Sequence, residues 1–197
     1  MSAAAFLDRI FPHVPRLSSS RFSFEAWKYA GRPTREGVGV LPGVAVDVER
    51  MAGRVMDVAS YTGNVEHVEE CRIVEGPEHD PPQAVRFYQR IKLPVLGAIH
   101  MELAMRDFGV RDGWRVIAWE QLGAATDRLS TKQGARTEYN LGAWLIKSDS
   151  VGYALASAPR KQDVGRLKFA AMTKGADASA PSVVKANIEG MLRWSQR

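Results

Sequence analysis

Histidine, cysteine and carboxylate residues gather in one short stretch of this sequence, and they are the first candidates for chemistry. His67 and Cys71 are four residues apart, and Glu66, Glu69 and Glu70 stand beside them. On a strand, positions 67 and 71 would share a face, so that one metal ion could reach both side chains. Structural zinc, however, normally needs four closely spaced soft ligands, and the chain has a single cysteine. We therefore expect no metal site and no cofactor.

The sequence gives little support to nucleophilic or phosphate chemistry. No serine stands in a Gly-x-Ser-x-Gly motif, and Cys71 has only His67 close to it in the sequence. The glycines Gly37, Gly39 and Gly43 are not followed by Lys-Ser or Lys-Thr, which a phosphate-binding loop would need.

One carboxylate interrupts an apolar pattern. Glu120 breaks the alternation of apolar residues in the segment 113–123. If the face that carries Val116 is buried, Glu120 is a carboxylate in an apolar lining, and a buried charge is costly unless something pairs with it. If Trp119 is buried instead, Glu120 is a solvated surface residue. The pattern leaves both alternatives open.

Two tyrosines and an aspartate are further candidates. Tyr139 and Tyr153 each lie on the apolar face of a predicted strand. A buried tyrosine hydroxyl needs a partner, and a bound ligand could supply it. Asp107 could act as an acid or base, but we expect it to form an ion pair with a neighbouring arginine.

Other residues fit the wall of an apolar chamber. Met101 and Met105 lie on one face of a predicted strand, and flexible thioethers suit a cavity with variable contents; methionines that fill gaps in a core are an equal alternative. Gln89 is the polar exception on the apolar face of the strand before. Asn187 and Met191 lie in or beside the apolar arc of the last predicted helix.

These residues need a sheet and a long helix to bring them together. Segments of alternating apolar residues, separated by short turns, predict an antiparallel meander. Before it, a strand is expected over 38–46 and a helix from Asp47, its N-cap, to about residue 59. Residues 181–197 predict an amphipathic helix whose wide apolar arc needs a concave partner. The predicted strands of the meander are 65–75, 83–93, 97–109, 113–123, 136–148, 151–159 and 165–174.

Length and composition are those of one ordinary globular domain. The chain has 197 residues, 45% hydrophobic and 25% charged, and a formal net charge of +5. Basic residues are spread along the chain beside acids, so we expect no nucleic-acid binding; a preference for anionic ligands or transient contact with membrane surfaces is the milder interpretation. We expect no signal peptide and no membrane span, hence a cytoplasmic protein. The pattern does not predict an oligomeric state.

The order of the predicted elements resembles the helix-grip fold of the START-like, or Bet v 1-like, (SRPBCC) superfamily. Residues 57–61 (Asp-Val-Ala-Ser-Tyr), 65–68 and 71–75 are similar to the end of the first helix and the following strand in START domains and in bacterial polyketide cyclase and dehydratase relatives. Residues 106–108 (Arg-Asp-Phe), which precede 112–114 (Asp-Gly-Trp), resemble a segment of START lipid-transfer domains.

The resemblance implies an α+β fold, in which a curved antiparallel sheet of about seven strands wraps around a long C-terminal helix. It covers residues 38–197, a START-like ligand-binding domain, and residues 1–37 are expected to be an extension that packs on it. Between sheet and helix it implies a tunnel for one hydrophobic molecule, such as a lipid, a sterol or a polyketide. The predicted ligand-binding residues are Gln89, Met101, Met105, Glu120, Tyr139, Tyr153, Asn187 and Met191.

Two functions follow as hypotheses. The first is a non-catalytic protein that binds, and can transfer, a hydrophobic molecule in this cavity, because such pockets are mostly apolar with few polar anchors. The second is a polyketide cyclase or dehydratase type of enzyme, in which Glu120, Tyr139, Tyr153 or Asp107 would serve as acid or base. We favour the first.

Overall fold

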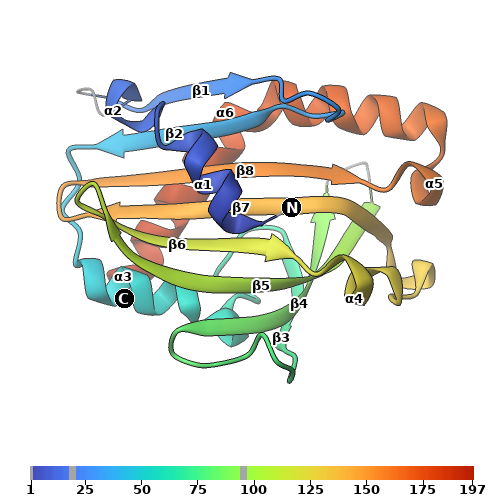
Figure 1. The fold of residues 1–197 in the computed structure, drawn as a ribbon, viewed down its shortest axis with the longest axis horizontal. Coiled ribbons are helices and arrows are strands. Elements are labelled where there is room, and N and C mark those ends of the chain that lie inside the picture. The colour runs from blue at the N-terminus through green and yellow to red at the C-terminus, as the bar shows by residue number, and fades with distance from the viewer. Residues whose placement is uncertain (1, 18–20, 94–96) are drawn as a thin grey trace.

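The protein is built on one curved antiparallel sheet, which has eight strands among the described residues 2–17, 21–93 and 97–197 (Figure 1). The structure is a computed structural model. The strand order is β1-β2-β8-β7-β6-β5-β4-β3, and β5 also pairs in parallel with the first residues of β7. The strands are β1 (Ser23–Trp27), β2 (Glu36–Pro42), β3 (Val68–Ile73), β4 (Ala84–Leu93), β5 (Gly97–Arg111), β6 (Trp114–Gln121), β7 (Ala135–Lys147) and β8 (Ser150–Pro159).

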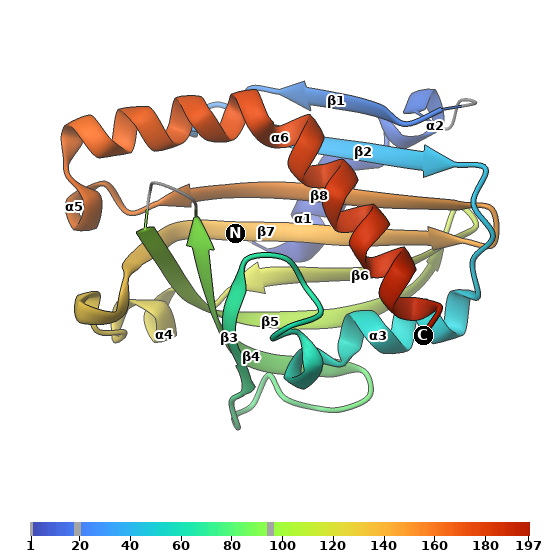
Figure 2. The same cartoon turned by 180° about the vertical axis from the view of Figure 1, so that it is seen from behind.

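Helices lie on both faces of this sheet. Figure 2 shows the long α6 crossing one face, and Figure 1 shows α1 in front of the other. The expected α+β class and helix-grip arrangement are confirmed. The α-helices are α1 (Ala3–Ile10), α2 (Val14–Leu17), α3 (Val48–Met56), α4 (Gly123–Asp127), α5 (Lys161–Val164) and α6 (Arg166–Ser195), and the short 3-10 helices are η1 (Val58–Ser60) and η2 (Thr131–Gln133).

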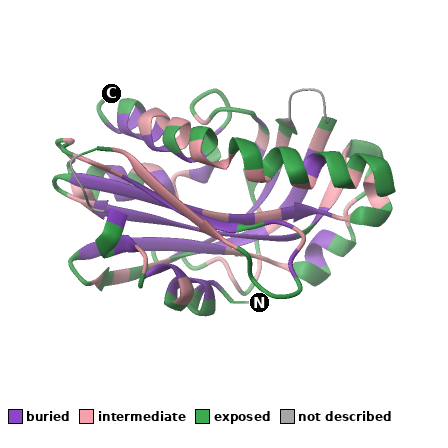
Figure 3. Ribbon diagram, turned by 90° about the horizontal axis from the view of Figure 1, so that it is seen from above, coloured by how far each residue is buried: buried purple, intermediate pink, exposed green. Residues whose placement is uncertain are grey.

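The sheet separates two apolar cores, and Figure 3 shows it as a continuous buried layer. We call the face toward α6 the inner face and the face toward α1 the outer face. Trp119, Trp144 and Ile188 belong to the inner core. Phe6 and Leu141 belong to the outer core. Because residues of a strand alternate between faces, neighbours in the sequence contribute to different cores.

The first forty residues are more regular than the sequence indicated. Ser2 caps α1 through its hydroxyl, which accepts a hydrogen bond from the amide of Ala5. Phe6 and Ile10 of α1 are fully buried against the outer face. β1 pairs with β2 and forms the edge of the sheet. The N-terminal segment therefore packs on the sheet, while its division from the rest at residue 37 stays a prediction.

The helix that follows β2 forms as its sequence predicts. The Asp47 carboxylate accepts a hydrogen bond from the amide of Arg50 (3.0 Å), which satisfies one of the free N–H groups of the first turn. Met51 and Val55 are fully buried on one side of α3 and join the inner core. The expected single helix is divided in two, because α3 ends at Met56 and η1 continues to Ser60.

Residues 166–174 are helical, and the prediction of a seventh meander strand at 165–174 was wrong. α6 begins at Arg166, and Pro181, expected in the first turn, lies inside it. Three alternating apolar residues are too few to distinguish a strand from a helix, and Leu167 is 89% exposed. Proline bends a helix because it lacks the N–H, and Figure 2 shows α6 as two segments of different direction. No helix in the described ranges is long and apolar enough to cross a membrane.

A glycine in β2 lets α6 approach the sheet. A Cβ atom at Gly39 would lie only 2.6 Å from Cγ1 of Val184, which is fully buried in α6. Glycine within a strand often marks such a close approach of another element. Gly39 therefore serves the packing of the C-terminal helix, whereas a Cβ atom at Gly37 would meet the ring of Phe24 in β1 at 2.6 Å.

Candidate functional site

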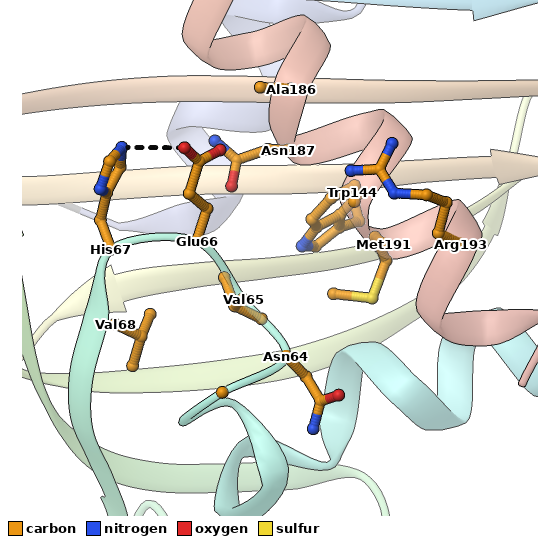
Figure 4. A pocket seen from close by; sticks show the side chains of 12 residues that line it. Asn64, Val65, Glu66, His67, Val68, Trp144, Ala186, Asn187, Met191 and Arg193 are labelled. Carbon is orange, nitrogen blue, oxygen red and sulfur yellow. Dashed lines mark ion pairs between the residues drawn. The ribbon is translucent and has the colours of Figure 1, made fainter.

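A pocket of about 420 Å³ lies between the loop that precedes β3 and the C-terminal half of α6 (Figure 4). Asn187 and Met191, both predicted from the sequence, line it from α6. Trp144 of β7 lies between the loop and the helix. The lining residues are Gly63, Asn64, Val65, Glu66, His67, Val68, Trp144, Ala186, Asn187, Gly190, Met191 and Arg193.

The pocket has an apolar floor and a polar rim. Trp144 and Met191 are buried members of the inner core. At the rim, Nε2 of His67 lies 3.3 Å from a carboxylate oxygen of Glu66, and both side chains are exposed (Figure 4). Arg193 is also exposed, and it forms no ion pair with any described residue. An apolar molecule can thus rest on the floor while the charged groups stay in water.

Backbone hydrogen bonds hold the loop opposite α6. The carbonyl oxygen of Tyr61 accepts bonds from the amides of Asn64 (3.0 Å) and Val65 (2.8 Å), and that of His67 accepts one from Lys92 of β4 (2.9 Å). His67 adopts a φ of +65°, in the left-handed region that few residues other than glycine occupy. The rim therefore keeps a defined shape, with strain at the residue that carries the imidazole.

The two predicted residues of α6 offer different chemical groups to the pocket. Nδ2 of Asn187 donates a hydrogen bond to the carbonyl oxygen of Val183, one turn earlier (2.9 Å). Its amide oxygen has no partner in the described parts of the chain, so it can accept a hydrogen bond from a bound molecule. Met191 offers an unbranched thioether, which adapts to the shape of a ligand.

Three more predicted residues lie on the inner face but outside the lining of the pocket. Met101 and Met105 are buried in the inner core, at alternating positions of β5. Gln89 of β4 stands between Met101 and Cys71 of the neighbouring strands and is 8% exposed. Their contact with a ligand stays a prediction.

The eighth strand carries Tyr153 on the same face. Trp144 and Tyr153 are cross-strand neighbours, and their ring centroids are 4.6 Å apart. The Trp119 ring of β6 also lies near Tyr153, with a centroid distance of 5.6 Å. Burial raises the pKa of Tyr153 well above its usual value, so the hydroxyl keeps its proton and can donate a hydrogen bond.

Neither the cysteine nor the aspartate is available for chemistry. Burial raises the pKa of Cys71 to about 12, and a thiol that stays protonated is a poor nucleophile and metal ligand. Asp107 forms an ion pair with Arg115, which confirms the expected pairing.

Glu120 and Tyr139 lie on the outer face, and this corrects their expected position. In β6 it is Trp119 that faces α6, whereas the Glu120 carboxylate accepts a hydrogen bond from the amide of Ala3 at the start of α1 (2.7 Å). The Tyr139 hydroxyl lies 2.6 Å from Oγ1 of Thr34. Alternation defines two sets of positions on a strand, but it does not say which set faces the helix.

Sequence reasoning missed Trp144 and the rim of the loop. Trp144 lies on the opposite face of its strand from Tyr139, which the sequence analysis places on the apolar face. One signal could have identified the right face: glycine within a strand marks a close approach, and Gly142, in phase with Trp144, has the Trp119 ring packed over it.

Comparison by sequence gave no match: no protein-family model matches the chain, and no curated protein is significantly similar to it. Solved structures are similar in fold. The STAR-related lipid transfer protein of Xanthomonas axonopodis matches with a TM-score of 0.70 at 13% identity, over 91% of this chain and 96% of that chain. The fold is that of the START domains.

Two human proteins have the same START fold. STARD10 matches with a TM-score of 0.67 at 15% identity, over 91% of this chain and 74% of that chain. StAR-related lipid transfer protein 5 matches with a TM-score of 0.67 at 7% identity, over 99% of this chain and 98% of that chain. At these identities the likeness is one of fold, and at that level the resemblance expected from the sequence is confirmed.

Proposed function

We propose that this START-fold protein binds, and can transfer, one hydrophobic small molecule, such as a lipid, a sterol or a polyketide-like compound, between the inner face and α6. The observation that carries the proposal is the pocket beside α6, whose floor is formed by Trp144 and Met191. Ligand sites of this kind are concave and mostly apolar, with a few polar groups that fix orientation. The matched structures named as lipid transfer proteins give the proposal further support.

We propose the cytoplasm as the location and transient contact with membranes as the means of loading. Cys71 is the one cysteine of the chain and is unpaired, as is usual in a reducing compartment. The net charge of +5 favours contact with anionic lipid surfaces.

The test is the binding of Nile red, a neutral hydrophobic dye, to protein stripped of lipid. Ala186→Phe places a ring in the pocket, and we expect it to weaken dye binding at least about tenfold, which corresponds to about 1.4 kcal/mol. Ala171→Phe is the matched control, because this residue is exposed in the other half of α6 and does not line the pocket. Native mass spectrometry of the purified protein would identify a retained molecule.

Equal dye binding by both variants would contradict the proposed location of the site. The alternative, an enzyme of the cyclase or dehydratase type, stays a prediction. Of its acid–base candidates, Glu120 and Tyr139 lie on the outer face and Asp107 is paired with Arg115, which is our reason for preferring a binding protein.

A further inference from the structure

The four buried tyrosines of the chain differ in what their hydroxyls contact. A buried tyrosine hydroxyl normally has a hydrogen-bond partner, because an unmade bond in an apolar setting is costly. Tyr153 differs: its hydroxyl has no partner within residues 2–17, 21–93 and 97–197, and although the residue is only 8% exposed, this oxygen is not among the fully enclosed unpaired atoms and so stays accessible. The three partnered hydroxyls are those of Tyr61 (to O of Val55, 2.5 Å), Tyr88 (to Nδ1 of His100, 3.2 Å) and Tyr139 (to Oγ1 of Thr34, 2.6 Å).

This unused hydroxyl lies next to the floor of the pocket. Tyr153 is the cross-strand neighbour of Trp144, which lines the pocket, and both belong to the inner core. A molecule that rests on the Trp144 ring therefore needs to extend by only one strand, about 5 Å, to reach Tyr153.

The surroundings of Tyr153 do not suit a charged group. A charge taken out of water needs a counter-ion or several hydrogen bonds, and the neighbouring inner-face positions supply no ionic side chain. On the outer face, by contrast, the buried carboxylate of Glu36 is held by Arg9 (2.9 Å). The inner-face neighbours on β7 and β8 are Asn140, Gly142, Trp144, Ile146, Val151, Leu155 and Ser157.

The nearest polar groups on this face are already engaged with one another. The Asn140 amide oxygen accepts a hydrogen bond from Nε1 of Trp119 (2.7 Å), and its nitrogen donates to Oγ of Ser157 (3.2 Å). The Tyr153 hydroxyl is thus the group on this part of the sheet that is free to bind one oxygen atom of a ligand.

We propose that the site selects uncharged molecules, and that the hydroxyl or carbonyl oxygen of the ligand forms a hydrogen bond with Tyr153. This inference rests on the proposed function and deepens it. The polar end of the ligand then lies inside, beside the Trp144 ring, and its apolar remainder extends toward Met191 and the rim. The opposite orientation, with a charged end outside at Arg193, is the competing arrangement.

Calorimetric titration with three probes of nearly equal size separates these arrangements. Naphthol is neutral and has a hydroxyl, naphthalene lacks the hydroxyl, and naphthoate is charged. We expect naphthol to bind best, and Tyr153→Phe to weaken naphthol binding about fivefold, the effect of one neutral hydrogen bond, with naphthalene unchanged. Because no internal bond is lost, Tyr153→Phe should resist urea at least as well as the wild type.

Three outcomes would overturn the inference. If naphthoate binds best, and Arg193→Gln weakens it while Tyr153→Phe does not, the polar end lies at the rim. If Tyr153→Phe is clearly less stable without any ligand, its hydroxyl has a partner inside the protein. If the three probes bind equally well, the site does not select uncharged molecules, although the apolar pocket is supported. If none of the probes binds and Nile red does not bind either, the proposed function is refuted as well.

Discussion

Gly142 of β7 provides the sharpest test of how the inner face is packed. A Cβ atom at this position would lie 2.0, 2.3 and 2.5 Å from three atoms of the Trp119 ring. The ring cannot simply move aside, because Nε1 donates a hydrogen bond to Asn140 and the Tyr153 ring lies close to it, with a centroid distance of 5.6 Å. Gly142→Ala should therefore cost about 1–3 kcal/mol for overpacking and about 1 kcal/mol for the strained hydrogen bond.

A glycine-to-alanine substitution in α3 should have the opposite effect on the free energy of unfolding. Gly53 lies inside α3 with no atom within 4 Å of an added Cβ, so Gly53→Ala should stabilise the protein by about 1 kcal/mol through helix propensity. Urea unfolding followed by circular dichroism measures both changes. In the double variant Gly142→Ala with Trp119→Leu, the cost of the alanine should largely disappear. A Gly142→Ala protein within about 0.5 kcal/mol of the wild type would refute the proposed packing of Trp119.

Two further predictions concern the outer face. Glu120→Gln removes the carboxylate charge that accepts a hydrogen bond from the Ala3 amide. The opening free energy of α1, measured by amide hydrogen exchange, should therefore fall by about 1 kcal/mol, while the affinity for Nile red stays unchanged. Unaltered exchange would show that this bond does not hold α1. Burial, helped by the charges of Arg136 and Arg90, lowers the pKa of His100. The unfolded chain therefore binds a proton at this histidine at a higher pH than the folded protein does. The free energy of unfolding of the wild type should fall as the pH drops below about 6.5, and this loss should end below the folded-state pKa of His100. In His100→Gln this loss should be smaller between about pH 7 and pH 5, and equal losses in urea unfolding would contradict it.

Much of the sheet could be predicted from alternation, and the failures have physical causes. The strands around Met101 and Trp144 were expected within a few residues of their observed ends, because an antiparallel meander with short turns repeats one signal. α1 and β1 were not expected, since they are short and acquire their order by packing on the sheet. The start of α6 was placed too late because a proline at residue 181 suits a first turn, yet here it lies mid-helix.

The candidate site was predicted only where a helix carried it. Asn187 and Met191 line the pocket. They could be predicted because an amphipathic helix has one apolar side, whose direction can be calculated from the sequence. A strand with apolar residues on both faces has no such marker. Tyr139 was therefore expected on the wrong side, the side of Glu120 stayed open although it was among the predicted ligand-binding residues, and Trp144 was overlooked; the positions of α1 and α6 show which face is which.

The two cores on either side of the sheet differ in how freely they can change. The outer core is closed by α1 with Phe6 and Ile10 fully buried, and its contents are fixed by the chain itself. Strands β2, β6, β7 and β8 contribute buried residues to this outer core and are thereby held from behind. The inner core is rich in methionine and is bordered by a two-segment helix, so it is the side of the sheet on which the proposed ligand would be exchanged. If the proposed function holds, the N-terminal helix, on the face opposite the pocket, keeps the sheet in place in both the empty and the filled molecule.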